Sequence, residues 1–91
     1  GTLQKGARIV FVGGANRAYN YNGIGYDGAP VSASDKVFSY DLKKSQWQEH
    51  SALTVPSMDH RALIEIDGVF YLPGGMRDPQ RVTNEGLIFR L

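Results

Sequence analysis

The sequence predicts an all-β fold, and three observations carry that prediction. Short runs of β-branched and aromatic residues recur along the chain, and none continues at the i, i+3, i+4, i+7 spacing of a helix. Glycine is frequent, with 11 of 91 residues, and turn-forming residues separate the runs. Asp67-Gly68 stands between two apolar runs, which is typical of a tight β-hairpin. A chain of this length forms one domain at most, and the core that it buries alone is marginal.

Six short strands follow from these runs in chain order. The first run is mostly β-branched and aromatic and ends at Gly13-Gly14, and the second ends at Asp41. The third carries Trp47 in alternation with polar residues, the fourth and fifth are the arms of the hairpin, and the sixth closes the chain. The expected strands cover residues 8–12, 37–40, 46–50, 62–66, 69–72 and 86–91.

Composition and charge exclude several classes of protein. The net charge of +1 lacks the basic excess of a nucleic-acid binder, so no nucleic-acid partner is expected. The absence of cysteine excludes a disulfide scaffold, a thiolate metal site and a thiol nucleophile. The longest apolar run, residues 9–12, is too short to cross a bilayer, so no membrane partner is expected. His50 and His60 fall on separate predicted elements, and no metal site is expected.

Two connections between the strands are long enough to draw attention. Residues 15–36 are rich in Tyr, Asn and Gly, and residues 76–85 form a shorter polar connection. A loop as long as the first, inside a compact domain, is usually functional or disordered. Ser57, Asp59 and His60 lie close together in sequence, but three neighbouring loop residues rarely converge on one centre, so they do not predict a catalytic triad.

The chain also repeats itself. An apolar strand that ends in Gly-Gly occurs at residues 8–14 and again at residues 69–75, and each is followed by a loop and a further strand. With the excess length of the first loop discounted, the period is close to the roughly 50 residues of a kelch repeat. The ordered set of residues resembles that family: Gly13-Gly14, Tyr40-Asp41, Trp47, Met58, Arg61, Gly68, Tyr71 and Gly74-Gly75. The second unit departs from the pattern, because Phe89-Arg90 replaces Tyr-Asp and Pro73 precedes the Gly pair.

The resemblance implies a β-propeller of four-stranded antiparallel blades, lettered A to D from the innermost strand outward. The chain would then contain strands B, C and D of one blade, in residues 1–53, followed by strands A, B and C of the next, in residues 54–91. Two partial blades imply a piece of a larger propeller, whose remaining blades or further copies are the expected partners. Structural roles are implied for Gly13, Gly14, Tyr40, Trp47, Gly74 and Gly75.

In the kelch fold the B–C and D–A loops emerge on one face and surround the channel mouth. That arrangement would bring loop 15–36 beside residues 53–60 and would place the turns at residues 42–45 and 67–68 on the far side. Tyr rings and Asn amides suit recognition of a sugar-like molecule or of a partner protein. The alternative is a lid, in which Tyr covers the blade while Gly and Asn form turns. The candidate ligand-binding residues are Tyr19, Asn20, Tyr21, Asn22, Tyr26, Asp27, His60 and Arg61.

The resemblance leads to two hypotheses about function. In the first, the chain is part of a propeller that serves as a ligand- or protein-binding scaffold. In the second, it is part of a sugar-handling kelch enzyme similar to a sialic-acid mutarotase, in which Asp59, His60 and Arg61 supply some of the polar and acid–base groups. A galactose oxidase-type centre needs a Cys-modified Tyr with copper, which this chain cannot hold by itself, and no cofactor is expected. The resemblance slightly favours a periplasmic or extracellular location.

Overall fold

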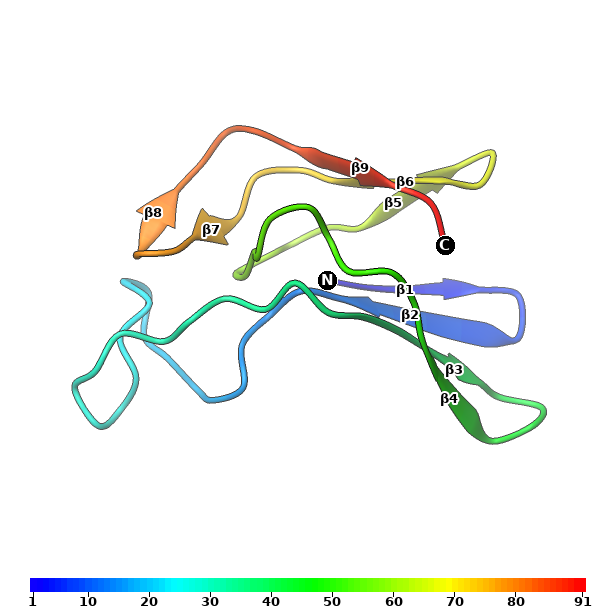
Figure 1. Ribbon diagram of the computed structural model, residues 1–91, viewed down its shortest axis with the longest axis horizontal. Coiled ribbons are helices and arrows are strands. Elements are labelled where there is room, and N and C mark those ends of the chain that lie inside the picture. The colour runs from blue at the N-terminus through cyan, green and yellow to red at the C-terminus, as the bar shows by residue number, and fades with distance from the viewer.

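The computed structural model describes all residues, 1–91, and contains strands and turns but no helix (Figure 1). The predicted all-β class is therefore confirmed. Every pairing between the strands is antiparallel. The strands are β1 (Thr2–Lys5), β2 (Arg8–Val12), β3 (Val37–Asp41), β4 (Gln46–Glu49), β5 (Ile64–Ile66), β6 (Val69–Leu72), β7 (Met76–Arg77), β8 (Arg81–Val82) and β9 (Leu87–Phe89).

The first sheet has four strands in the order β1-β2-β3-β4, so each strand pairs with its neighbour in sequence. Three of these strands were expected from the sequence, and β1 is an additional one, which pairs with β2 through Leu3 opposite Val10. Residues 2–5 contain one apolar side chain, Leu3, and no alternating pattern that predicts a strand. Their extended conformation comes from pairing with β2 across the turn at Gly6, whose φ is +58°.

The second sheet has three strands in the order β5-β6-β9. The predicted hairpin through Asp67-Gly68 is confirmed: Ile66 lies opposite Val69, and both turn residues have positive φ, 51° and 82°. A type I′ turn requires that conformation at both central positions. The first arm begins at Ile64 rather than at Ala62, and the last strand covers residues 87–89 rather than 86–91.

Both long connections are more ordered than the sequence suggested. The shorter one contains the hairpin β7–β8, in which Met76 lies opposite Val82. Loop 15–36 is held by three isolated bridges, which join Ala15 to Ala33, Tyr19 to Gly25 and Ile24 to Pro30. Short, nested pairings of this kind carry no long hydrophobic alternation and so leave little trace in the sequence.

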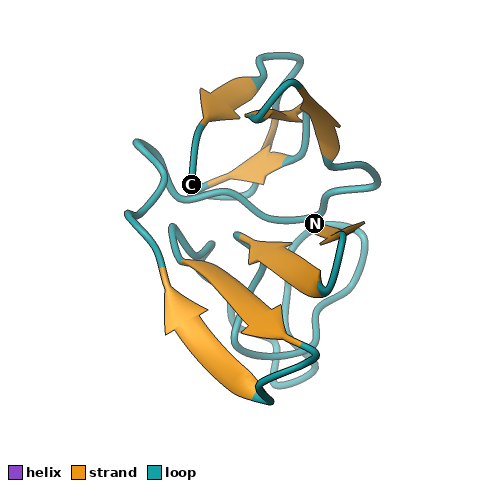
Figure 2. Ribbon diagram, turned by 90° about the vertical axis from the view of Figure 1, so that its right-hand side faces the viewer, coloured by secondary structure: helices purple, strands orange, loops and turns teal.

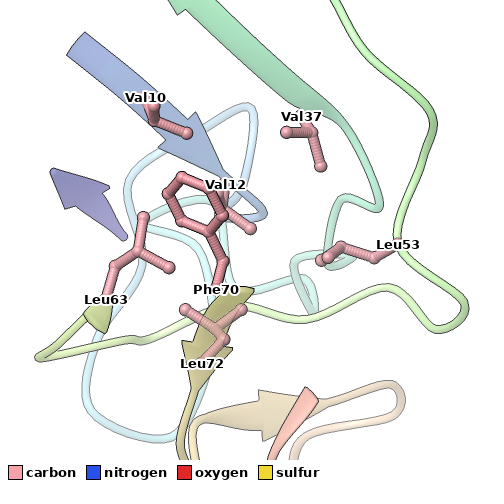
Figure 3. Close-up of a cluster of buried hydrophobic side chains, with 7 residues drawn as sticks. All are labelled: Val10, Val12, Val37, Leu53, Leu63, Phe70 and Leu72. Carbon is pink, nitrogen blue, oxygen red and sulfur yellow. The ribbon is translucent and has the colours of Figure 1, made fainter. Parts of the chain in front are cut away.

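The two larger sheets stack face to face (Figure 2), with the main hydrophobic core between them (Figure 3). Phe70 is 1% exposed and, with Leu63 and Leu72, meets valines of the first sheet. A second cluster joins Val31 of loop 15–36 to Met58 and Met76. The main core consists of Val10, Val12, Val37, Leu53, Leu63, Phe70 and Leu72.

The sheet surfaces that point away from this core are largely apolar, and no other layer of the chain packs on them. Side chains alternate between the two faces of a strand, and the register fixes which residues share a face. On the first sheet we call this surface the tryptophan face; its apolar part is formed by Ile9, Phe11, Phe38, Tyr40 and Trp47, and the register also places Thr2, Gln4 and Glu49 on it. On the second sheet we call it the isoleucine face, which is formed by Ile64, Ile66, Val69, Tyr71 and Ile88.

The internal repeat is visible in the backbone hydrogen bonds that follow each Gly-Gly pair. In the first half, the N–H of Gly13 donates to the carbonyl of Lys36 at 2.9 Å. The N–H of Ser34 donates to the carbonyl of Gly14 at 2.8 Å. Both bonds close the long loop immediately before β3 begins.

The second half makes the same pair of bonds. The N–H of Gly74 donates to the carbonyl of Glu85, and the N–H of Thr83 donates to the carbonyl of Gly75, both at 3.1 Å. Gly74 and Gly75 therefore occupy the positions of Gly13 and Gly14. The strand register agrees with that superposition, because Phe11 opposite Phe38 corresponds to Leu72 opposite Leu87.

All long connections leave the sheets at one end, and the tight turns lie at the other (Figure 1). The turns at residues 6–7, 42–45 and 67–68 share one end, while loop 15–36 and the β7–β8 hairpin share the opposite end. Loop 15–36 and the Lys43-Lys44 turn therefore lie at opposite ends, as predicted from the sequence. No helix is present that is long and apolar enough to cross a membrane.

Candidate functional site

The candidate site is the end of the molecule at which three connections meet. We call it the loop end, and it consists of residues 15–36, 53–60 and 73–82. Backbone hydrogen bonds join the three segments. The N–H of Ser57 donates to the carbonyl of Ser34 at 3.0 Å, and Met58 and Met76 exchange two bonds of 2.9 and 2.7 Å. The loop end is therefore a connected structure built on both sheets.

Loop 15–36 folds largely through its own polar side chains. The Asn20 Oδ1 atom accepts the N–H groups of Asn22 and Ile24, at 2.8 and 3.2 Å. Asn and Asp often bond backbone groups two residues ahead in this way and so stabilise turns. Asn20 thus forms a turn, as the lid alternative expected. Its side-chain oxygen already accepts two hydrogen bonds from the loop backbone.

Asp27 is held in a similar way, with a cation added. Its Oδ1 atom accepts the N–H of Ala29 at 3.0 Å, and its Oδ2 atom forms an ion pair with Arg17. The Arg17 Nη2 atom also donates to the carbonyl of Pro30 at 3.1 Å. The Ala29 N–H first, and then Arg17, lower the pKa of Asp27. Asp27 therefore stays ionised and closes the tip of the loop.

Two of the three loop tyrosines point into solvent. Tyr21 is 86% exposed and Tyr26 is 85% exposed. Tyr26 lines a shallow hollow beside Arg17 and Asp27. The surrounding backbone is fixed by the bonds of Asn20 and Asp27, so the two rings are large, exposed groups on an ordered support.

Tyr19 behaves differently from the other two. It packs against the second hydrophobic cluster and is half-buried. Burial, and then the charge of Asp59, raise the pKa of its phenol, and Arg61 acts in the opposite direction. The structure therefore brings Tyr19 close to Asp59 and Arg61, which joins the long loop to the segment that leads into β5.

His60 faces inward. Its Nε2 atom lies 2.7 Å from the Ser57 hydroxyl, which Arg77 also contacts at 3.3 Å. Its Nδ1 atom is buried and has no hydrogen-bond partner. Burial, and then the positive charge of the N-terminus, lower the pKa of His60. Ser57 itself is fully buried, so this Ser–His pair is closed to a substrate.

The remaining candidates divide between the surface and the interior. Arg61 is exposed. Asn22 is also exposed, and its backbone carbonyl accepts a hydrogen bond from the Gln80 side-chain amide at 2.9 Å.

Among the predicted structural residues, Tyr40 and Trp47 pack edge to face with ring centroids 4.9 Å apart. Trp47 is nevertheless 63% exposed, because nothing in the chain covers the tryptophan face.

The four repeat glycines all have positive φ, but their surroundings differ. A Cβ atom on Gly75 would lie 2.8 Å from the Met58 carbonyl oxygen and would overlap the His60 ring. A Cβ atom on Gly14 would meet nothing within 4 Å. Gly75 is thus required for close packing at the loop end, whereas Gly14 is required only for its backbone conformation.

Sequence reasoning missed several groups that hold the loop end together. Arg17 closes the tip of loop 15–36, and Gln80 ties that loop to the β7–β8 hairpin. The Asp78 Oδ1 atom accepts the N–H of Ala33 at 2.9 Å and makes a second tie. No sequence spacing signals these contacts, since the partners lie on different connections and meet only after the sheets have formed.

Comparison with known proteins adds no family assignment, because the chain matches no family model and no curated protein.

Proposed function

We propose that the chain is a pair of neighbouring blades from a kelch-type β-propeller and that it serves as a binding scaffold. Support for the propeller comes from the repeated bonds at Gly13 and Gly74, from the shared register of the two sheets and from their face-to-face stacking. Blades of a propeller bury their faces against their neighbours. The apolar outer faces lie where further blades of such a fold would pack.

The proposed binding surface is the loop end, and the exposure of Tyr21 and Tyr26 carries the assignment. Two large rings, 86% and 85% exposed, stand on a loop whose turns are held by internal bonds of Asn20 and Asp27. Asn20 and Asp27 hold the support, and the tyrosines are free to make contact. Pre-ordering the support lowers the entropic cost of binding.

A partner protein fits this surface better than a small sugar. Sites for small molecules are concave and enclose most of the ligand. Tyr21 and Tyr26 instead project from an open surface, and Tyr is among the residues that most often dominate the affinity of protein interfaces. Arg61, which is also exposed, supplies a charged group at the same end.

The enzyme hypothesis has weaker support from the arrangement of groups. An acid–base residue must reach a substrate proton within hydrogen-bond distance. The Nε2 atom of His60 is bonded to the buried Ser57 hydroxyl, and its Nδ1 atom is shielded from solvent. Neither ring nitrogen is therefore presented to a ligand, and binding without chemistry is the function that we infer.

The proposal is tested by selecting phage-displayed peptides on the immobilised chain and screening a glycan array in parallel. We then compare the chain with Tyr21→Ala/Tyr26→Ala and, as a control, with Leu42→Ala at the opposite end. Loss of two interface anchors is expected to weaken selected peptides at least about tenfold. Leu42→Ala should bind them normally, and the melting temperature of all three should agree.

Three results would count against the proposal. Peptides that bind the double variant unchanged would place the contact elsewhere. A large drop in its melting temperature would show that the rings pack as a lid. Glycans that bind while no peptide does would assign the surface to sugars.

A further inference from the structure

The tryptophan face and the isoleucine face are large apolar surfaces on opposite sides of the molecule. Trp47 is 63% exposed on the first, and Ile66 and Ile88 are 57% and 67% exposed on the second. Contiguous exposed apolar patches of this kind usually mark an interaction site. The internal repeat indicates what each of them fits.

The tryptophan face corresponds to a surface that is buried in the second sheet. In the repeat superposition Ile9 and Phe11 occupy the positions of Phe70 and Leu72. Phe70 and Leu72 are 1% and 0% exposed, because their face packs against the first sheet. In the same way, Phe38 and Tyr40 occupy the positions of Leu87 and Phe89, which pack against the core.

The isoleucine face corresponds to the other half of that contact. Tyr71 and Ile88 occupy the positions of Val10 and Ser39, which are 0% and 2% exposed on the buried side of the first sheet. Ile64 likewise occupies the position of Leu3, which packs at the margin of the core. Each exposed face is therefore the repeat equivalent of one side of the buried contact between the sheets.

The ion pair that crosses the buried contact has no charged equivalent on the outer faces. Across the buried contact, Lys5 forms an ion pair with Glu65 at 3.5 Å. The repeat equivalents on the outer faces are Ile66 for Lys5 and Gln4 for Glu65. Both are neutral, so joining the two outer faces leaves neither member of this pair as an unpaired buried charge.

We propose that the tryptophan face of one copy of this chain docks on the isoleucine face of a second copy, and repeats between molecules the contact made within each. Such an interface is heterologous, since two different surfaces meet. Heterologous contacts generate a ring when the rotation closes and an open filament when it does not. The proposal rests on the repeat geometry and is independent of binding at the loop end.

The test uses two variants that each block one face. Trp47→Lys places a charge on the tryptophan face, and Ile88→Lys does so on the isoleucine face. Both side chains are more than 60% exposed, so the fold should tolerate either change. Val82→Lys is the matched control, because Val82 is 80% exposed on β8 and belongs to neither face. Circular dichroism verifies folding, and Ile66→Lys replaces Ile88→Lys if the latter unfolds.

Sedimentation velocity over a range of concentrations gives the readout. The unmodified chain and Val82→Lys should associate beyond the dimer, whereas each face variant alone should remain monomeric. Mixing the two face variants should give a dimer with one copy of each, because only one pair of intact, complementary faces remains. The charge should raise the dissociation constant at least about tenfold.

Each other outcome overturns the proposal. Continued association of a single face variant would show that identical faces meet. A mixture that stays monomeric would show that the two faces do not fit each other. A monomeric unmodified chain at concentrations near 1 mM would show that the faces do not bind further copies of the chain.

Discussion

Gly14 and Gly75 are repeat equivalents with nearly the same φ, 94° and 91°, yet only Gly75 is closely packed. Replacing either by Ala imposes a strained backbone, at a cost of about 1–3 kcal/mol. At Gly75 the new methyl group also lies 2.8 Å from the Met58 carbonyl oxygen and overlaps the His60 ring. Overpacking of that kind costs about 1–3 kcal/mol more. Gly75→Ala should therefore lower the free energy of unfolding further than Gly14→Ala does, by about that amount.

Urea unfolding followed by circular dichroism measures the difference. With a slope of about 1–3 kcal/mol per M, Gly75→Ala should unfold at a urea concentration lower than Gly14→Ala by roughly 0.5–2 M. Part of the loss should be recovered in Gly75→Ala/His60→Ala relative to His60→Ala alone, because the ring is then absent. The Met58 carbonyl is backbone and cannot withdraw, so recovery should be incomplete.

Equal losses in Gly14→Ala and Gly75→Ala would refute the reasoning. They would mean that backbone conformation alone decides both positions and that the loop end adjusts to an extra methyl group. Should Gly75→Ala fail to fold while Gly14→Ala folds, the ranking still holds and the cost at Gly75 exceeds the stability of the chain. The comparison is internal to one protein, since the two residues differ mainly in what lies beside them.

Two further predictions follow from the core and from His60. Phe70→Ala should lower the free energy of unfolding by about 3–5 kcal/mol, because the ring is 1% exposed between the sheets; urea unfolding checks this, and a loss below 1 kcal/mol would contradict the stacking. The pKa of His60 is lowered in the folded chain, so the unfolded chain, in which the pKa is near the ordinary value of 6.5, binds the proton more readily. Stability should therefore be fully present above that value and decline as the pH falls through it toward the folded pKa; thermal melts from pH 8 to 5 should show this decline, and it should be smaller in His60→Gln.

The parts of the fold that the sequence predicted are those fixed by local chemistry. The β5–β6 hairpin was predictable because Asp67-Gly68 supplies two residues that accept positive φ between two apolar runs. Strand β1 was not predictable, since its residues become extended through pairing with β2. Its sequence alone offers a single apolar side chain, Leu3.

In the candidate site, too, only the features fixed by local sequence could be predicted. A Tyr-rich loop is evident in the sequence, but which rings are exposed depends on where the second hydrophobic cluster forms, and that cluster buries part of Tyr19. The contact between Ser57 and His60 was not anticipated because it needs a reversal of the chain between them. Asp59 provides it with a φ of 62°, an uncommon conformation for a residue other than glycine.

The nested bridges of loop 15–36 bear on how the first sheet assembles. Pairing β2 with β3 in one step would require closure of the whole loop before any ladder bond forms, and the entropic cost of closure rises with loop length. The contacts Tyr19–Gly25 and Ile24–Pro30 each close a much shorter segment, and Ala15–Ala33 then needs only a small additional closure. The loop can thus form its contacts in order from its tip toward the sheet. This order lowers the effective contact order of the β2–β3 pairing and favours faster formation of its register.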